Sequence, residues 1–483
     1  MNSLSLSPSN IMYGGHEIRS RCLAQYSLAP QLAETMAQSC SSPAREGAST
    51  DRRQARYHGL DFLRASMMLL GVVLHVLIAY WEFPGPSEDL RSPDSAMSFM
   101  PYRSPGRGES VEIILVLIHF FRMPAFYLLA GFFGALLIAR RGAREYLWNR
   151  TTRILFPLVV GWFVLWPMAR FAFGMGQSLM YAEPGQGTLA NALAENPFWM
   201  HLPFVSEWPH DLMHLWFLHY LVLFYIVTVP LALWVDRPGG RLRERLHRIS
   251  HELLLGRWRR LRFPALIGLT VLATLPQQTP GLLTTFRFTP NPTVFSVYFL
   301  FFLVGWLFYA HRDIIGGLRR RAGLWTLLGF AMMGLVVYPL GTNFNEAGAG
   351  EADLLMGSAT LQIRAYWALH SIAMWMAILG LMGLSERVFT RHHPTVRYVV
   401  DASYWVYLIH FPISVMVPVL FHDWTLDADL KMWVMTLLVA AISFVSYHFL
   451  VRSTFLGKAL NGRRYPRQLP WKEQSLPATD AAR

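Results

Sequence analysis

The first apolar segment of the chain carries one acidic and two basic side chains at helical spacing. It reads Leu60-Asp61-Phe62-Leu63-Arg64 and then stays largely apolar as far as His75. Asp61 precedes Arg64 by three residues, so a helix would place both on one face, where they can pair. His75 follows Arg64 by eleven residues, about three helical turns, and lies on the same face about 16 Å further along the axis.

Other apolar segments carry further groups of the same kinds. His119 and Arg122 lie one turn apart at the start of the second segment, and His214 and Trp216 lie at the start of the fourth. Both segments begin on the side where the first one ends, so we expect these side chains near His75. A cluster of imidazoles with a guanidinium suits acid/base chemistry on hydroxyl protons and stabilisation of negative charge.

Three more residues each allow two interpretations. Arg150 and Arg153 lie one turn apart before the third segment, a geometry that suits phosphate oxygens. Arginines at the cytoplasmic end of a membrane helix are also common without any ligand. His410 lies about seven residues into the ninth segment, shortly before Pro412. A role in the site and simple packing within a kinked helix are equally compatible with this position.

The elements that must hold these groups are predicted to be transmembrane helices. The chain is 53% hydrophobic and only 15% charged, whereas soluble domains average about 25% charged residues. Its apolar blocks are about 20 residues long, enough to cross a bilayer as helices. We therefore expect an all-α polytopic membrane protein with about ten spans. These are 60–81, 113–139, 154–175, 213–234, 264–277, 292–310, 322–341, 365–385, 403–421 and 431–451.

The distribution of basic residues predicts the orientation of these spans. One alternating set of connections holds 34 Lys and Arg residues, and the other set holds 5. Basic residues are retained on the cytoplasmic side, so both termini should be cytoplasmic and the protein should lie in a bacterial inner membrane. Residues 1–55 are expected to form a disordered cytoplasmic tail, 56–452 the membrane domain and 453–483 a cytoplasmic C-terminal tail.

Composition also argues against several other classes of protein. The net charge of +13 comes largely from basic residues in the connections on one side of the predicted spans. The membrane topology therefore accounts for this charge, and we expect no nucleic-acid partner. Cys22 and Cys40, the two cysteines, both precede the first span, and their placement favours no disulfide framework, zinc site or thiol nucleophile. We expect no metal cofactor.

Five short motifs occur in order between about residues 56 and 451. They are Leu60-Asp61 with Arg64 and His75, His119-Phe120-Phe121-Arg122-Met123-Pro124 with Gly131-Phe132, Arg150-x-x-Arg153 with Ile154-Leu155 and Pro157, His214-Leu215-Trp216-Phe217-Leu218, and Asp401-Ala402-Ser403 through Tyr407-Leu408-Ile409-His410. Together they resemble the acyltransferase-3 family of integral membrane enzymes. Within that family they are most similar to the glucans biosynthesis protein C group, which succinylates periplasmic glucans.

This resemblance implies an acyl-CoA donor on the cytoplasmic side, a glycan acceptor on the periplasmic side and His75 as the catalytic residue. His75 would act as a general base on a sugar hydroxyl or as a transient acyl carrier, and the donor would be succinyl-CoA or acetyl-CoA. The candidate residues are His75, Arg122 and His214 for catalysis, Arg64, Arg150 and Arg153 for the phosphates of acyl-CoA, and Asp61, His119, Trp216 and His410 in supporting positions.

Two other classes of function remain open at this stage. A transporter or flippase for an acyl or glycan intermediate would also need charged groups inside its spans. Such proteins are often built from matching halves with interrupted helices, and no internal repeat is detectable. A non-catalytic membrane assembly partner would leave the spacing of Arg64 and His75 without a purpose.

Overall fold

The computed structural model describes residues 57–81, 110–183, 185–206, 211–235, 241–277, 279–346, 358–391 and 393–467. No β-strand occurs within these ranges. The tail predicted at 1–55, with both cysteines, lies outside the described residues, and so does the end of the C-terminal tail beyond residue 467.

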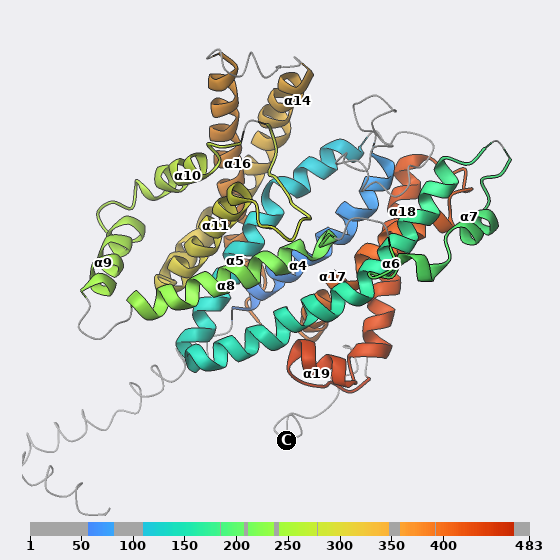
Figure 1. Ribbon diagram of the computed structural model, residues 1–483. Helices are drawn as coiled ribbons and strands as arrows, with labels where there is room; N and C mark the ends of the chain where they lie inside the picture. The colour runs from blue at the N-terminus through green and yellow to red at the C-terminus, as the bar shows by residue number, and fades with distance from the viewer. Residues whose placement is uncertain are drawn as a thin grey trace, which may run out of the picture. The chain divides into compact units, whose positions relative to one another are not determined.

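Most of the described residues lie in helices, several of them long (Figure 1). The first half comprises α4 (His58–Leu77) continued by a 3₁₀ turn (Ile78–Tyr80), α5 (Val111–Arg150), α6 (Phe156–Met180), α7 (Leu189–Glu195), a 3₁₀ turn (Phe198–His201), a 3₁₀ turn (Met213–Leu215), α8 (Trp216–Val235) and α9 (Leu242–Leu254). The second half comprises α10 (Arg262–Ala273), α11 (Pro292–Ala310), α12 (Asp313–Leu318), a 3₁₀ turn (Arg319–Arg321), α13 (Ala322–Met332), α14 (Tyr338–Glu346), α16 (Ser358–Val388), α17 (Pro394–Leu420), α18 (Ala428–Ser446) and α19 (Phe455–Asn461). Five-residue π-helices join α5 to α6 (Thr151–Leu155) and α13 to α14 (Met333–Val337), and another continues α18 (Tyr447–Val451).

Eight helical segments of the described chain are long and apolar enough to cross a membrane. One of them, Val111–Met180, is 70 residues long and contains both the second and the third expected spans. The fifth expected span corresponds to α10, which has only 12 residues. Each of the ten expected spans is therefore helical, and the protein is an all-α, multi-pass membrane protein.

The connection expected at 140–153 is itself helical. Gly142 has a φ of 79°, a value that glycine adopts without strain, and the chain bends there before the helix resumes. The last turn of α5 then continues through the π-helix into α6, so Arg150 lies at the end of α5 and Arg153 in the π-helix rather than in a loop.

Contacts between helix ends agree with alternating helix directions. The N–H of Leu60, at the start of α4, donates to Glu386 Oε1 near the end of α16 at 2.9 Å. The Ser110 hydroxyl, just before α5, donates to Asp429 at the start of α18 at 2.8 Å. We call the end of the helices where α4 begins the inner end, because the arginine-rich connections lie there, and the opposite end the outer end.

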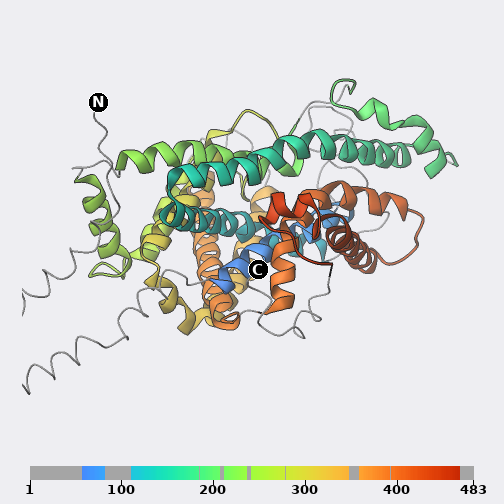
Figure 2. The same cartoon turned by 90° about the horizontal axis from the view of Figure 1, so that it is seen from below.

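Helix α4 lies at the centre of the helices that carry the candidate residues. It packs against α5, α16, α17 and α18, and both views show it between α5 and α17 (Figures 1 and 2). The face of α4 that carries Arg64 and His75 is therefore turned toward other helices rather than toward lipid.

Glycines allow α5 and α11 to approach each other closely. A Cβ atom added at Gly131 of α5 would overlap the carbonyl oxygen of Phe302, and one added at Gly305 of α11 would overlap the carbonyl oxygen of Leu128. Small residues at such crossings permit backbone contact between membrane helices, which dispersion forces then stabilise.

We predict that Gly305→Ala destabilises the protein because the methyl group forces α5 and α11 apart. The free energy of unfolding should fall by about 1–3 kcal/mol, as for other overpacked cores. The change would appear as a lower Tm in detergent. Gly268→Ala in α10 is the matched control, because nothing lies within 4 Å of a Cβ atom there. Equal melting temperatures of the two variants would contradict this packing.

Candidate active site

The outer halves of α4, α5, α8 and α17 enclose a cavity of about 480 Å³, which we call the outer cavity. The loop at 280–286 covers part of it. Six of the residues singled out in the sequence line this cavity: His75, His119, Arg122, His214, Trp216 and His410. The structure thus gathers residues that are up to 335 positions apart in the sequence.

Three histidines meet in this cavity around one phenylalanine. The ring centroid of His75 lies 5.2 Å from that of His410 and 4.9 Å from that of Phe411. The ring of His214 stacks on that of Phe411 with centroids 4.9 Å apart and lies 5.5 Å from that of His410. Such distances allow a proton to pass between neighbouring rings when a substrate hydroxyl or a water bridges them.

A proline in α17 explains why His214 takes its position. The proline at position 412 has no N–H, so the carbonyl of Leu408, four residues earlier, has no helical donor. The Nε2 atom of His214 lies 2.9 Å from that carbonyl oxygen and donates to it. In return, the Tyr407 hydroxyl donates to the carbonyl oxygen of His214 at 2.9 Å. The start of α8 is therefore fastened to the interrupted turn of α17.

The hydrogen bonds of the histidines also fix which ring nitrogens are free. The Nδ1 atom of His410 lies 2.7 Å from the backbone carbonyl oxygen of Tyr407. Because a carbonyl oxygen only accepts, Nδ1 must carry the proton and donate it, and Nε2 is then the free acceptor of the neutral ring. That Nε2 atom is buried and has no hydrogen-bond partner in the described structure. His75 makes no hydrogen bond to any described residue, and its buried Nδ1 atom is likewise unpartnered. Both imidazoles remain available to a substrate.

Arg122 enters the same cluster through a gap left by a glycine. A Cβ atom at Gly71, one turn before His75, would lie 2.7 Å from Arg122 Nη1 and 3.4 Å from His410 Nε2. The missing side chain at Gly71 therefore provides the space in which the guanidinium reaches the histidines. A fixed positive charge beside an imidazole can stabilise an oxyanion that forms there.

The inner halves of α4, α8 and α17, together with the α5–α6 junction, enclose a second cavity of about 190 Å³, the inner cavity. Arg64, Arg150 and Arg153, the three arginines expected to bind phosphates, all line it. The predicted ion pair is present, with Arg64 Nη2 3.1 Å from Asp61 Oδ1. The Arg150 guanidinium lies 5.2 Å from the ring of Tyr225, an arrangement that holds it at the cavity wall.

The inner cavity carries an excess of positive charge. Arg397 also lines it but is neutralised by Asp401, with Nη2 and Oδ1 2.6 Å apart. Arg64 is paired with Asp61. Arg150 and Arg153 have no carboxylate partner among the described residues, so the cavity is poised to bind an anion.

Three apolar side chains line both cavities: Met68, Phe126 and Phe217. The rings of Phe126 and Phe217 meet edge to face, with centroids 4.4 Å apart. The two cavities therefore adjoin end to end across the membrane domain, and a thin apolar partition separates the arginines from the histidines.

Comparison with known proteins identifies the family. A family model described as an acyltransferase domain, acyltransferase-3, matches residues 57–448. The chain belongs to this family. It is 22% identical over 365 residues to glucans biosynthesis protein C of Salmonella schwarzengrund (strain CVM19633), an alignment that covers 74% of this chain and 82% of that protein. The protein of the same name from Salmonella typhi is 23% identical, with the same coverage. No solved structure matches significantly.

Family membership makes this protein an acyltransferase, which decides between the enzyme and the transporter considered from the sequence. The match also covers both cavities, since their lining residues lie between 64 and 461 and only the contribution of α19 falls outside it.

The structure shows a charged pair beside the site that sequence reasoning missed. Arg170 of α6 and Asp211 form a buried ion pair beside the start of α8. Asp211 also accepts a hydrogen bond at 3.0 Å from the N–H of Met213, whose φ of 43° is unusual for a residue with a side chain. This strained turn immediately precedes His214. Arg170 lies in an apolar segment, so the criterion that selected Arg122 could have selected it as well.

The Arg170 guanidinium also affects a neighbouring histidine outside the spans. His201 is buried in the 3₁₀ turn Phe198–His201. Burial, followed by the nearby Arg170 guanidinium, lowers the pKa of His201 below its usual value. His201 therefore stays neutral near neutral pH and adds no second cation beside Arg170.

We predict that Pro412→Ala reduces acyl transfer without loss of stability. The new N–H at position 412 would bond to Leu408 within α17 and displace the ring of His214. Removing a proline from a helix interior can stabilise it by up to about 3 kcal/mol, whereas transfer should fall by about tenfold or more because His214 loses its anchor. Thermal unfolding and transfer rates in proteoliposomes measure the two effects.

Pro418→Ala, in the same helix but outside both cavity linings, is the control for Pro412→Ala. This variant also removes a proline ring from α17 but does not affect the Leu408 carbonyl. Full activity of Pro412→Ala, or an equal loss in Pro418→Ala, would refute the role of the interrupted turn.

We also predict that Gly71→Ala lowers activity by displacing the Arg122 guanidinium. The added methyl group would lie 2.7 Å from Nη1, so the arginine must move away from His410. Removing one oxyanion donor typically costs about 10²–10³ in rate, and partial displacement should cost less. Gly161→Ala in α6 is the control, because its nearest neighbour would lie at an ordinary 3.6 Å. Transfer rates of the two variants should differ by about tenfold or more.

Proposed function

We propose that this acyltransferase moves an acyl group from acyl-CoA, bound at the cytoplasmic face of a bacterial inner membrane, to a hydroxyl of a glycan on the periplasmic face. The observation that carries the proposal is the arrangement of two adjoining cavities, one with unpaired arginines at the inner end and one with histidines at the outer end. A donor and an acceptor on opposite sides of the membrane require such an arrangement.

The inner cavity supplies the groups that would bind the donor. Guanidinium groups bind phosphate oxygens through paired, charge-assisted hydrogen bonds. Arg150 and Arg153 have no carboxylate partner among the described residues, so the phosphates of CoA would meet charges that are not already neutralised. Arg64 adds a third cation whose charge is partly offset by Asp61.

The acyl thioester would reach the histidines by passing the partition of Met68, Phe126 and Phe217. Arg64 and His75 lie on one helix about 16 Å apart along its axis, a distance that the flexible pantetheine arm of CoA has to bridge. The flexible methionine side chain and the neighbouring rings can change rotamer and so open a path for this arm. An apolar partition also prevents water from crossing to the thioester.

His75 would act as the general base in the outer cavity. Its free ring nitrogen takes the proton of a sugar hydroxyl as the oxygen attacks the thioester carbonyl. The resulting tetrahedral oxyanion lies beside Arg122, which stabilises it. Collapse breaks the C–S bond, and the departing thiolate of CoA receives the proton from His75. The products are an O-acylated glycan and free CoA, and His75 is neutral again.

A transient acyl group on His75 is the second form of the same mechanism. His75 would attack the thioester directly, and a neighbouring imidazole would then deprotonate the sugar hydroxyl that takes up the acyl group. His410 is placed for this role, since its ring lies 5.2 Å away and its Nε2 atom is free. In this form the thiolate of CoA leaves first and takes the N–H proton of the acylated His75 ring. The proton that the hydroxyl loses in the second step passes through His410 to His75 as the acyl–nitrogen bond breaks, so both forms yield the O-acylated glycan, free CoA and neutral His75.

The names of the relatives favour a glucan as the acceptor, because both are glucans biosynthesis proteins. At 22–23% identity the outer loops and the cavity lining can differ in specificity. The extra cation at Arg122 is compatible with a succinyl group, whose free carboxylate it could pair with, and an acetyl group would leave it unpaired.

We predict that His75→Ala abolishes transfer while the protein still inserts and accumulates. Loss of a general base typically costs about 10²–10⁴ in rate. Inner-membrane vesicles incubated with radiolabelled acyl-CoA and glucan would report the transfer as label on the glycan. Normal labelling by this variant would remove His75 from the mechanism.

His219→Ala is the matched control, because it removes an imidazole from the first turn of α8 that lines neither cavity. It should retain most of its activity. Incubation of the intact protein with labelled donor that labelled no glycan would contradict the proposed glycan acceptor.

A further inference from the structure

A third cavity, of about 540 Å³, lies at the inner end of the helices and shares no lining residue with the other two. We call it the lateral cavity. It is enclosed by the end of α9, the start of α10, the end of α11, the short helix α12, the start of α13 and one turn of α16. Neither the mechanism nor the family motifs use any of its residues.

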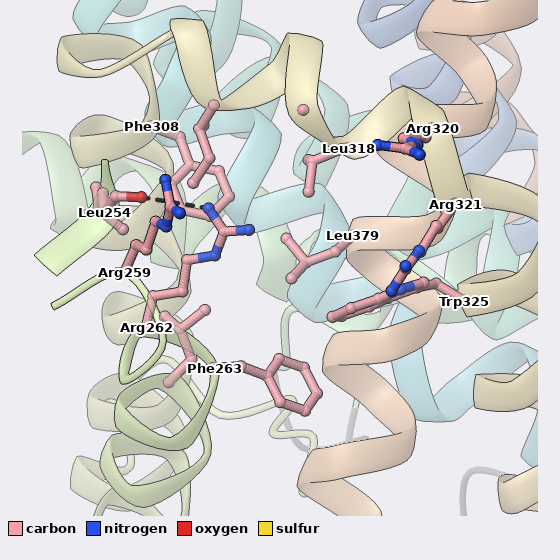
Figure 3. Close-up of a pocket in the computed structure, with 13 residues that line it drawn as sticks. Leu254, Arg259, Arg262, Phe263, Phe308, Leu318, Arg320, Arg321, Trp325 and Leu379 are labelled. Carbon is pink, nitrogen blue, oxygen red and sulfur yellow. Dashed lines mark hydrogen bonds between the residues drawn. The ribbon is translucent and has the colours of Figure 1, made fainter. Parts of the chain in front are cut away.

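Four arginines line the lateral cavity: Arg259, Arg262, Arg320 and Arg321. Figure 3 shows Arg259 and Arg262 on one side of it and Arg321 with Trp325 on the other. Arg262 Nη1 donates to the carbonyl oxygen of Leu254 at 3.2 Å, which holds that guanidinium at the cavity wall. No carboxylate belongs to the described lining, so the cavity attracts an anion.

The remaining wall of the lateral cavity is apolar. Leu318 and Leu379 lie between the two groups of arginines in Figure 3. The other apolar lining residues are Leu254, Phe263, Leu266, Phe308, Ile314 and Trp325. A ligand that fits this surface must combine an anionic group with hydrocarbon, which a free phosphate or a nucleotide does not.

The surroundings of the lateral cavity indicate where such a ligand comes from. Next to Arg259, Trp258 is 46% exposed and Leu261 is 56% exposed. On the other side, Leu324 and Leu328 of α13 are 53% and 44% exposed. In a membrane protein, exposed tryptophan and leucine beside basic residues at the inner end mark contact with the lipid interface. The cavity is therefore flanked by lipid on both sides.

We propose that the lateral cavity binds an anionic phospholipid of the inner leaflet, with the phosphate between the arginines and the acyl chains along the apolar wall. Basic pockets between membrane helices at the cytoplasmic side are suited to such headgroups. The bound lipid would connect α10, the shortest of the expected spans, to α12 and α13. This inference is independent of the proposed donor and acceptor.

The first test compares two variants of equal charge. Arg259→Gln/Arg321→Gln removes one arginine from each side of the cavity, whereas Arg245→Gln/Arg248→Gln removes two exposed arginines of α9 that do not line it. Native mass spectrometry of purified protein titrated with phosphatidylglycerol would measure binding. We expect binding to the cavity variant to weaken about 10- to 30-fold and binding to the control to stay within about twofold of the unmodified protein.

The second test fills the cavity without changing any charge. A Cβ atom at Gly316 or at Gly317 of α12 would meet nothing within 4 Å, but only Gly317 belongs to the described lining. Gly317→Leu should therefore reduce lipid binding about tenfold or more, and Gly316→Leu should leave it unchanged. Both variants place the same residue in the same short helix, so unfolding would affect them alike.

Three outcomes would overturn the proposal. Equal weakening in the cavity and control arginine variants would show a general attraction to surface charge. Equal affinity for phosphatidylglycerol and the zwitterionic phosphatidylethanolamine would remove the role of the arginines. Displacement of bound lipid by millimolar inorganic phosphate or CoA would make the cavity a site for soluble anions instead.

Discussion

The carbonyl oxygen of Leu408 is the point on which the outer site depends. Helix α17 leaves it without a helical donor because residue 412 is a proline, and the His214 imidazole provides the missing hydrogen bond at 2.9 Å. In a membrane interior water cannot satisfy such a group, so the two helices must stay together. The same contact orients His214, places the turn before α8 beside Arg170 and Asp211, and leaves His410 next to His75.

Burying charge among apolar helices imposes the second constraint, and the inner and outer cavities satisfy it differently. At the inner end, Asp61 and Asp401 pair with Arg64 and Arg397, and the charges of Arg150 and Arg153 remain for a ligand. At the outer end, the gap at Gly71 admits the Arg122 guanidinium beside two imidazoles. Met68, Phe126 and Phe217 keep the two regions apart, so each can face a different aqueous compartment.

Much of the site could be predicted from the sequence because ionisable residues inside apolar segments are rare. His75, Arg122 and His214 are notable for that reason. The uneven distribution of Lys and Arg between the two sets of connections also predicts that all the outer candidates lie on the same side of the membrane. Arg170 carries the same signal and was overlooked, since no neighbouring motif drew attention to it. Gly71 and the partition residues could not be recognised as part of the site from the sequence, because glycine and phenylalanine are common in membrane helices without any role in a site.

The sequence by itself determined the helical class, the alternation of the spans and the spacing of Arg64 and His75 along α4, because hydrophobic length, charge asymmetry and helical rise are local properties. Only the tertiary structure decided that His410 belongs with His75 and His214, that the arginines line a cavity separate from the histidines, and that a third cavity opens among Arg259, Arg262 and Arg321. These facts depend on which helix faces which, and helix packing is set by side-chain fit between segments far apart in the chain.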